Sequence, residues 1–162
     1  MLSNKFLTKT IILNFILFFS FSISTNYLIN LKIINLTSYV LFHITLIYLI
    51  FYYYHYSLLF LSFIYGVLYD YYLFNNFAPH LICFLLLIIS IMVLKKNLFN
   101  LNSLKITFVI IFYIFLIFIF ETILASVLYN YSFDYKKFFN LLLISSIIFF
   151  PTIYFFSKID NL

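Results

Sequence analysis

The sequence predicts an all-α fold, a polytopic membrane helix bundle of about six transmembrane helices with both termini in the cytoplasm. Hydrophobic residues make up 67% of the 162 residues and charged residues only 8%, with a mean hydropathy of +1.18. Apolar stretches near the length of a membrane span, roughly 20 residues, recur along the chain. Lysines stand singly or in pairs between these stretches, where topology determinants are usually placed. We therefore expect residues 1–162 to form a single integral membrane domain.

Six stretches meet the requirement for a span: 8–28, 38–54, 57–74, 79–94, 106–128 and 138–157. The first follows two lysines and ends in serines placed where a signal peptide would be cleaved, but its length and the later spans favour an uncleaved helix. The second ends at "YYYHYS" (52–57), a tyrosine-rich turn of the kind favoured at the headgroup level.

The remaining spans are separated by polar or helix-breaking segments. "NNFAPH" (75–80) divides the third from the fourth, because it has two asparagines and then Pro79, which fits the first turn of the next helix. "KKNLFNLNSLK" (95–105) and "YNYSFDYKK" (129–137) are polar loops that bound the fifth span. Spans two to four are short, so one of them could be tilted or re-entrant.

The distribution of lysines predicts the orientation. Six spans place both termini on one side of the membrane, together with six of the nine lysines: Lys5, Lys9, Lys95, Lys96, Lys105 and Lys158. The positive-inside rule makes that side cytoplasmic.

Several function classes are disfavoured. The net charge of +5 does not predict nucleic-acid binding, because the lysines form no basic patch. Cys83 is the only cysteine, so it forms no intrachain disulfide and no metal site unaided. There is no carboxylate pair at short spacing, no nucleophile elbow, no HExxH and no phosphate-binding glycine loop. We expect neither enzymatic activity nor a cofactor or metal.

The stretch "SFIYGVLYDYYLF" (62–74) contains the only glycine and one of the four acidic residues. Asp70 lies beyond the midplane of the third span, where a carboxylate costs about 2.5–3.5 kcal/mol on insertion scales. Ser62, Gly66 and Asp70 follow one another at intervals of four residues and so form one stripe of the helix. Small residues at this spacing let another helix approach closely. The stripe predicts a buried contact seam with a polar group near its outer end.

Three interpretations of Asp70 remain open: contact with a partner or subunit, a structural role in which it pairs within the bundle or snorkels to the outer interface, and a transport or proton-relay role. His80, at the start of the fourth span, could meet Asp70 across the intervening turn. Glu121, deep in the fifth span beside Thr122 and Ala125, is a possible intramembrane polar contact. A neutral structural hydrogen bond explains Glu121 at least as well as a functional role.

The third and fourth spans resemble the bacterial rod shape-determining protein family MreD. The resemblance consists of Gly-x-x-x-Asp, here Gly66 and Asp70, and a histidine ten residues after the aspartate, here His80. Where relatives often have glycines in the turn, this chain has Phe74 and Ala78.

The C-terminal quarter, "NYSFDYKKFFNLLLISSIIFFPTIYFFSK", also resembles the close of that family. It has a short outer loop, a last helix with Pro151 near its end and a basic tail with Lys158. The resemblance covers roughly residues 57–162, and before them only the hydropathy agrees.

The resemblance implies a non-enzymatic, multi-pass subunit of the bacterial inner membrane that belongs to the cell-elongation machinery. It implies an MreC-like partner and functional links to the MreB filament, the RodA glycosyltransferase and a penicillin-binding transpeptidase, all concerned with peptidoglycan synthesis and cell shape. The partner-binding residues would be Ser62, Gly66, Asp70 and His80.

Two other function classes are compatible with a small six-span protein. One is the substrate-binding subunit of a vitamin or metal uptake transporter, which needs several convergent polar groups in an enclosed pocket. The deep polar residues of this chain are few and scattered, which counts against that class. The other is a respiratory subunit that uses Asp70 and Glu121 as proton relays.

Overall fold

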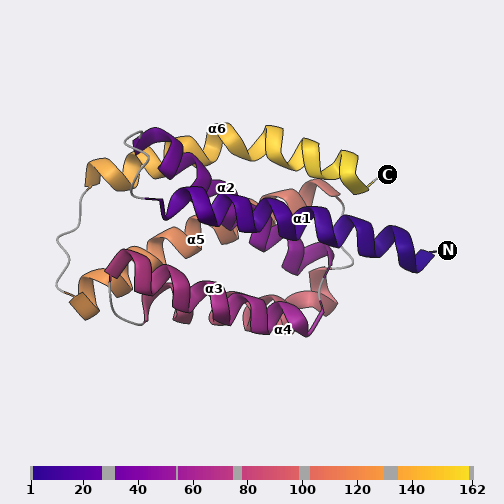
Figure 1. Ribbon diagram of the computed structural model, residues 1–162, viewed down its shortest axis with the longest axis horizontal. Coiled ribbons are helices and arrows are strands. Elements are labelled where there is room, and N and C mark those ends of the chain that lie inside the picture. Colours follow the sequence, from indigo (N-terminus) through magenta and orange to yellow (C-terminus); the bar gives the residue numbers. More distant parts are fainter. Residues whose placement is uncertain are drawn as a thin grey trace. The chain divides into compact units, whose positions relative to one another are not determined.

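The described part of the chain is entirely helical. A computed structural model describes residues 2–26, 32–53, 55–74, 78–98, 103–129 and 135–160, with side chains from Thr8 onward except at 95–98 and 103–105. Within these ranges there are six α-helices and no strand (Figure 1). They are α1 (Leu2–Ser24), α2 (Lys32–Tyr52), α3 (Ser57–Phe74), α4 (Pro79–Leu98), α5 (Ser103–Tyr129) and α6 (Tyr135–Asp160). The predicted all-α class is confirmed.

The helices occupy the six predicted stretches, with differences at some ends. α1 ends at Ser24, where residue 28 was expected, and α2 begins at Lys32, where residue 38 was expected. Asn35 and Thr37 belong to the first turns of α2 and not to a connecting segment. Hydropathy misplaced this boundary because polar residues are compatible with a helix end even where they interrupt an apolar run. The turn residues 75–77 and the loop residues 130–134 lie outside the described ranges.

Among the residues that the structure describes, four helical segments are long and apolar enough to cross a membrane: Lys32–Tyr52, Ser57–Phe74, Ile106–Tyr129 and Tyr135–Asp160. The apolar stretches of α1 and α4, Thr8–Ser24 and Pro79–Leu94, are shorter. These lengths support the predicted membrane protein. The number of six spans and the cytoplasmic position of the termini stay predictions.

The contacts within the chain divide it into two compact units. The first consists of Met1–Leu49 and Tyr135–Leu162, and the second of Ile50–Asp134. The first unit thus contains α1, most of α2, and α6, whereas the second contains α3, α4 and α5. The residues discussed in the sequence analysis as a contact seam all lie in the second unit.

The first unit has an apolar core with α2 at its centre. Every residue of α2 from Phe42 to Leu49 is buried. Its aromatic side chains contact both other helices, Phe42 with Phe21 of α1 at 6.2 Å between ring centroids and Tyr48 with Phe156 of α6 at 4.9 Å. α2 therefore contacts both α1 and α6.

One polar cluster closes the first unit where α6 ends. The Lys9 ammonium donates a hydrogen bond to the main-chain oxygen of Asp160, and the Tyr48 hydroxyl donates one to the Asp160 carboxylate. The N-terminal end of α1 and the C-terminal end of α6 lie toward the same end of this unit in Figure 1. Asp160 thus joins α6 to both α1 and α2.

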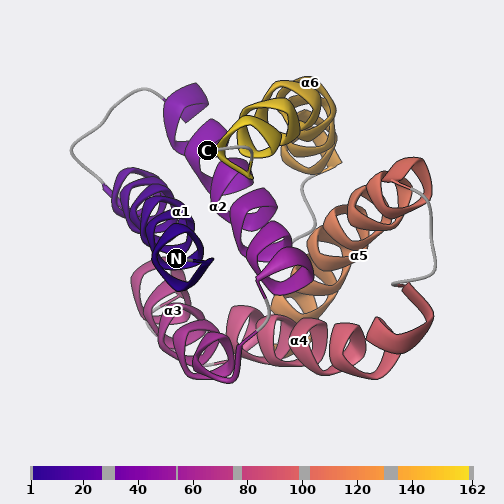
Figure 2. The same ribbon diagram turned by 90° about the vertical axis from the view of Figure 1, so that its right-hand side faces the viewer.

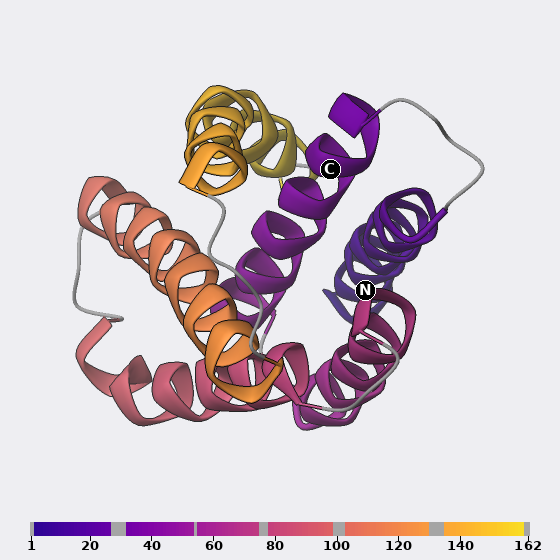
Figure 3. The ribbon, with the colours of Figure 1, turned by 90° about the vertical axis from the view of Figure 1, so that its left-hand side faces the viewer.

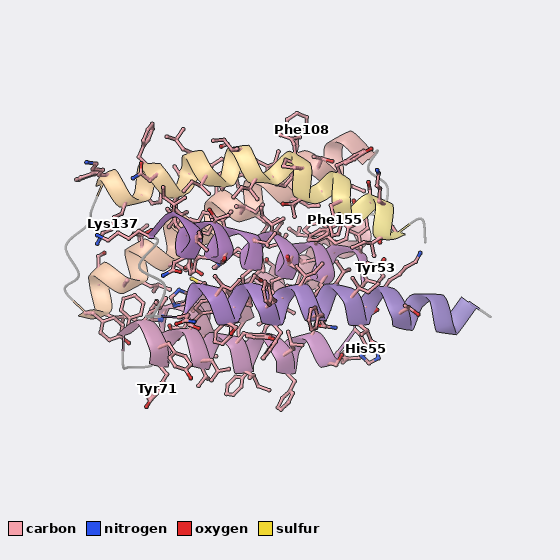
Figure 4. The ribbon with its side chains drawn as sticks, turned by 45° about the horizontal axis from the view of Figure 1, so that its top comes forward. Tyr53, His55, Tyr71, Phe108, Lys137 and Phe155 are labelled. Carbon is pink, nitrogen blue, oxygen red and sulfur yellow. The ribbon has the colours of Figure 1, made fainter. Side chains whose placement is uncertain are left out.

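In the second unit, α3 buries one face and exposes the other. The buried face consists of Leu58, Ser62, Gly66, Tyr69 and Asp70, whose spacing of three or four residues places them on one side of a helix. Tyr71 and, on α5, Phe108 project away from their helices in Figure 4 and are largely exposed. In a bilayer, such apolar and aromatic faces contact lipid.

Candidate functional site

The N-terminus of α4 has no capping side chain of its own. Ala78 precedes the helix and its carbonyl oxygen accepts the first helical hydrogen bond, from the Ile82 N–H at 3.0 Å. Pro79 occupies the first helical position and has no N–H to satisfy. A capping residue normally accepts from the N–H groups of the second or third helical residue, which the methyl group of Ala78 cannot do. The N–H groups of His80 and Leu81 therefore need another acceptor.

Asp70 of α3 supplies that acceptor. Its Oδ2 accepts hydrogen bonds from the N–H groups of Ala78 and Leu81, each at 3.0 Å. Its Oδ1 accepts one from the His80 N–H at 2.9 Å and one from His80 Nδ1 at 2.8 Å. Because a carboxylate only accepts, Nδ1 of His80 is the donor in the last of these bonds. The negative group also faces the positive end of the α4 dipole.

The depth of Asp70 in the protein makes these bonds energetically important. Its relative exposure is 0% and that of His80 is 2%. A buried carboxylate without partners is very costly, whereas one that engages both oxygens recovers much of the cost. Asp70 is thus paired with His80 inside the protein. A pair within the bundle is one of the interpretations that the sequence left open.

The backbone at Ala78 is strained. Its φ angle is 151°, the only positive value among the non-glycine residues that the structure describes, and a residue with a side chain rarely adopts it. Such a conformation persists where surrounding contacts impose it. Here the N–H of Ala78 is bonded to Asp70 and its carbonyl to Ile82.

Gly66 allows α3 and α4 to approach closely. A Cβ atom at this position would lie 2.6 Å from Leu81 Cα and 3.1 Å from Leu81 N. These are backbone atoms, so the clash could be relieved only by moving the helices apart. Gly66 lies one turn before Asp70 on the same face of α3, and Leu81 follows His80. The close approach at Gly66 thus places the Asp70 carboxylate within reach of the α4 N-terminus.

Aromatic side chains enclose the His80 ring. Tyr69 stacks on it with ring centroids 5.3 Å apart, and Phe84 meets it edge-on at 6.1 Å. Phe74 lies 5.8 Å from it and itself stacks on Tyr129 of α5 at 5.4 Å. This enclosure fixes the ring orientation that Nδ1 needs for its bond to Asp70, and it joins the α3–α4 turn to α5.

The other two predicted residues lie apart from these bonds. Ser62 is fully buried on the same face of α3, and its hydroxyl has no hydrogen-bond partner within the described ranges. Glu121 is buried on α5. Among the described residues, no three His, Cys, Asp or Glu side chains lie close enough together to hold a metal ion.

The structure thus brings three of the predicted residues, Gly66, Asp70 and His80, together at the start of α4. We call this arrangement the α3–α4 clasp: Gly66 against Leu81, and Asp70 bonded to Ala78, His80 and Leu81. The main-chain donors and the aromatic enclosure were not predicted. A signal for the donors was present, since no Ser, Thr, Asp or Asn directly precedes Pro79 to cap the helix.

Comparisons with protein-family models, with curated proteins and with solved structures gave no match to this chain. The geometry of the clasp is therefore the main guide to its role. With four hydrogen bonds already accepted by Asp70, the carboxylate would have to release a helix terminus before it could bind another donor.

Proposed function

We propose that this chain is a non-enzymatic, multi-pass subunit of the bacterial inner membrane that acts in the cell-elongation machinery, as MreD does. It spans the membrane six times with both termini in the cytoplasm, and it binds an MreC-like membrane protein. Through that partner it is linked to the MreB filament, the RodA glycosyltransferase and a penicillin-binding transpeptidase, and so scaffolds peptidoglycan synthesis.

The single observation that supports this proposal best is the α3–α4 clasp. Gly66, Asp70 and His80, the residues on which the resemblance rests, act together on one structural task. A motif that holds two helices in a fixed relation suits a scaffold, whose function depends on a preformed surface. If the surface is already ordered before binding, less conformational entropy is lost when the partner binds.

In this proposal the four partner-binding residues act indirectly. Ser62, Gly66 and Asp70 lie on the buried face of α3, and His80 is buried at the start of α4. The partner therefore contacts the outer surface of the α3–α4 pair, and the clasp holds that surface in its binding-competent form. Loss of the clasp weakens the complex by lowering the population of that form.

Co-purification from native membranes tests the proposal. Asp70→Leu should preserve insertion but reduce the amount of MreC-like partner recovered with the tagged chain. Gly66→Leu should reduce it similarly, because its side chain would clash with the α4 backbone at Leu81. The matched control is Asn140→Leu, which makes the same polar-to-leucine change at an exposed position of α6.

The co-purification results distinguish a failure of the proposed partner contact from a failure of the proposed function. Reduced recovery with both clasp variants, normal recovery with Asn140→Leu and equal membrane content of all three support the proposal. Unchanged recovery with both clasp variants in cells that nevertheless lose their rod shape would show that the clasp does not serve this partner. Full recovery and normal cell shape would contradict the proposed function itself.

A further inference from the structure

A groove lies between α4 and α5, and its lining begins at Cys83, one turn after the clasp residue His80. Its volume is about 390 Å³, within the range of sites that hold small ligands. Ten residues line it: Cys83, Leu86, Leu87, Ser90, Leu94, Phe112, Tyr113, Leu116, Ile117 and Phe120. All belong to the second unit, so the groove is formed within one compact part of the chain.

The lining is almost entirely apolar. The hydroxyl of Ser90 is bonded to the main-chain oxygen of Leu87 at 2.8 Å, so it is already engaged within its own helix. Two of the lining residues, Leu86 and Phe112, are largely exposed. A groove of this kind, on helices in a bilayer, offers a hydrocarbon chain favourable packing and offers water very few hydrogen bonds.

The sequence places lysines in both helices near one end of the groove. Leu94 lines it at the α4 end, and Lys95 and Lys96 follow directly in the same helix. Lys105 lies in the first turn of α5, seven residues and about 10 Å before Phe112. No acidic residue occurs between Lys95 and Lys105. Figures 2 and 3 show that α4 and α5 diverge toward the end where α4 finishes and α5 begins.

We propose that the α4–α5 groove is a binding site for one anionic phospholipid, with an acyl chain in the groove and the phosphate group at the lysine-bearing end. An apolar slot bounded by helix ends that carry three lysines in the sequence complements such an amphiphile in both of its parts. Each lysine near a membrane surface attracts anionic lipid by about 1 kcal/mol. A zwitterionic lipid fits the slot equally well but gains little from the lysines.

Single-tryptophan quenching by brominated lipids tests this site, because the chain contains no tryptophan. The full chain is reconstituted with Leu116→Trp, which places the reporter in the groove. Brominated phosphatidylglycerol should quench it with at least about threefold higher apparent affinity than brominated phosphatidylcholine. The control reporter is Ile123→Trp on the same helix, half exposed and outside the lining, where the two lipids should quench alike.

Charge variants in the groove-reporter background test the phosphate end. The triple variant Lys95→Gln, Lys96→Gln, Lys105→Gln should abolish the preference for phosphatidylglycerol. The matched triple variant Lys32→Gln, Lys136→Gln, Lys137→Gln removes the same charge from other helices and should leave the preference intact. Equal loss in both triple variants would show a general surface-charge effect and overturn the assigned headgroup position.

A filling variant tests the acyl-chain end. Ser90→Phe should reduce quenching of the groove reporter by both lipids, whereas Ser126→Phe should not. The two serines are matched, since each is bonded to the carbonyl three residues earlier in its own helix at 2.8 Å. Equal lipid selectivity at the groove and control reporters, or quenching that Ser90→Phe leaves unchanged, would overturn the proposal.

Discussion

Asp70 accepts two hydrogen bonds from His80, one from its main-chain N–H at 2.9 Å and one from its ring Nδ1 at 2.8 Å. Asp70 thus caps α4 by accepting from the main-chain N–H of His80, and the His80 ring completes the pairing of the buried carboxylate. The offset of ten residues is long enough to cross the turn between α3 and α4. In apolar surroundings each lost bond leaves a group that water cannot satisfy.

Asp70→Asn should destabilise the protein although its shape is nearly unchanged. The amide keeps one acceptor oxygen but turns an NH₂ group toward two N–H donors, and the charge facing the helix dipole is lost. We expect a loss of about 3 kcal/mol in the free energy of unfolding, as for a buried pair deprived of one partner. Reversible unfolding in mixed micelles, followed by circular dichroism, measures it.

His80→Ala should destabilise the protein less than Asp70→Asn does. It removes the ring donor and the stack on Tyr69 but keeps the main-chain N–H, so its cost should be about 1–2 kcal/mol. In a double-mutant cycle with Asp70→Asn, the two changes should be less than additive because they share one bond. Strict additivity would show that the ring bond contributes nothing.

Gly66→Ala should destabilise the α3–α4 pair even though alanine is the better helix former. The helix propensity favours alanine by about 1 kcal/mol, but the new Cβ would lie 2.6 Å from Leu81 Cα. Overpacking against backbone should outweigh the gain and leave a net loss of about 1–2 kcal/mol. Ser62→Ala on the same face is the control and should be neutral or slightly stabilising, since it removes a buried hydroxyl without a partner.

Ala78→Gly should stabilise the protein. The φ angle of 151° is costly for alanine and accessible to glycine. The gain is reduced by the greater freedom of glycine in the unfolded chain, so we expect a net increase of about 0.5–1 kcal/mol. The same micelle unfolding assay checks the sign. A decrease would mean that Ala78 does not hold the strained conformation.

The helices followed from hydropathy because each apolar stretch is long and is bounded by polar or helix-breaking segments. The α3–α4 clasp could be predicted from the sequence only in part. The spacing of Ser62, Gly66 and Asp70 predicted a buried seam, but a single sequence does not state which neighbour covers it, and α4 and a partner helix were both possible. The strain at Ala78 depends on how Asp70 draws the turn together, which no local pattern specifies.

Other contacts were beyond sequence reasoning because they join distant parts of the chain. Asp160 meets Tyr48 across 112 residues and Lys9 across 151. Nothing in the local pattern around Asp160 distinguishes it from an ordinary residue in a polar tail. The groove between α4 and α5 likewise depends on how two helices diverge, while their sequences show only continuous apolar character.

Amide hydrogen exchange at the start of α4 tests the central claim most directly. In the wild-type protein, the N–H groups of Ala78, His80 and Leu81 should exchange slowly, because all three are bonded to Asp70. Asp70→Asn should accelerate their exchange at least about tenfold, the equivalent of 1.4 kcal/mol, in the native-state openings that do not expose the Ile88 amide in the middle of α4. Equal exchange rates at the three amides in the two proteins would contradict the clasp.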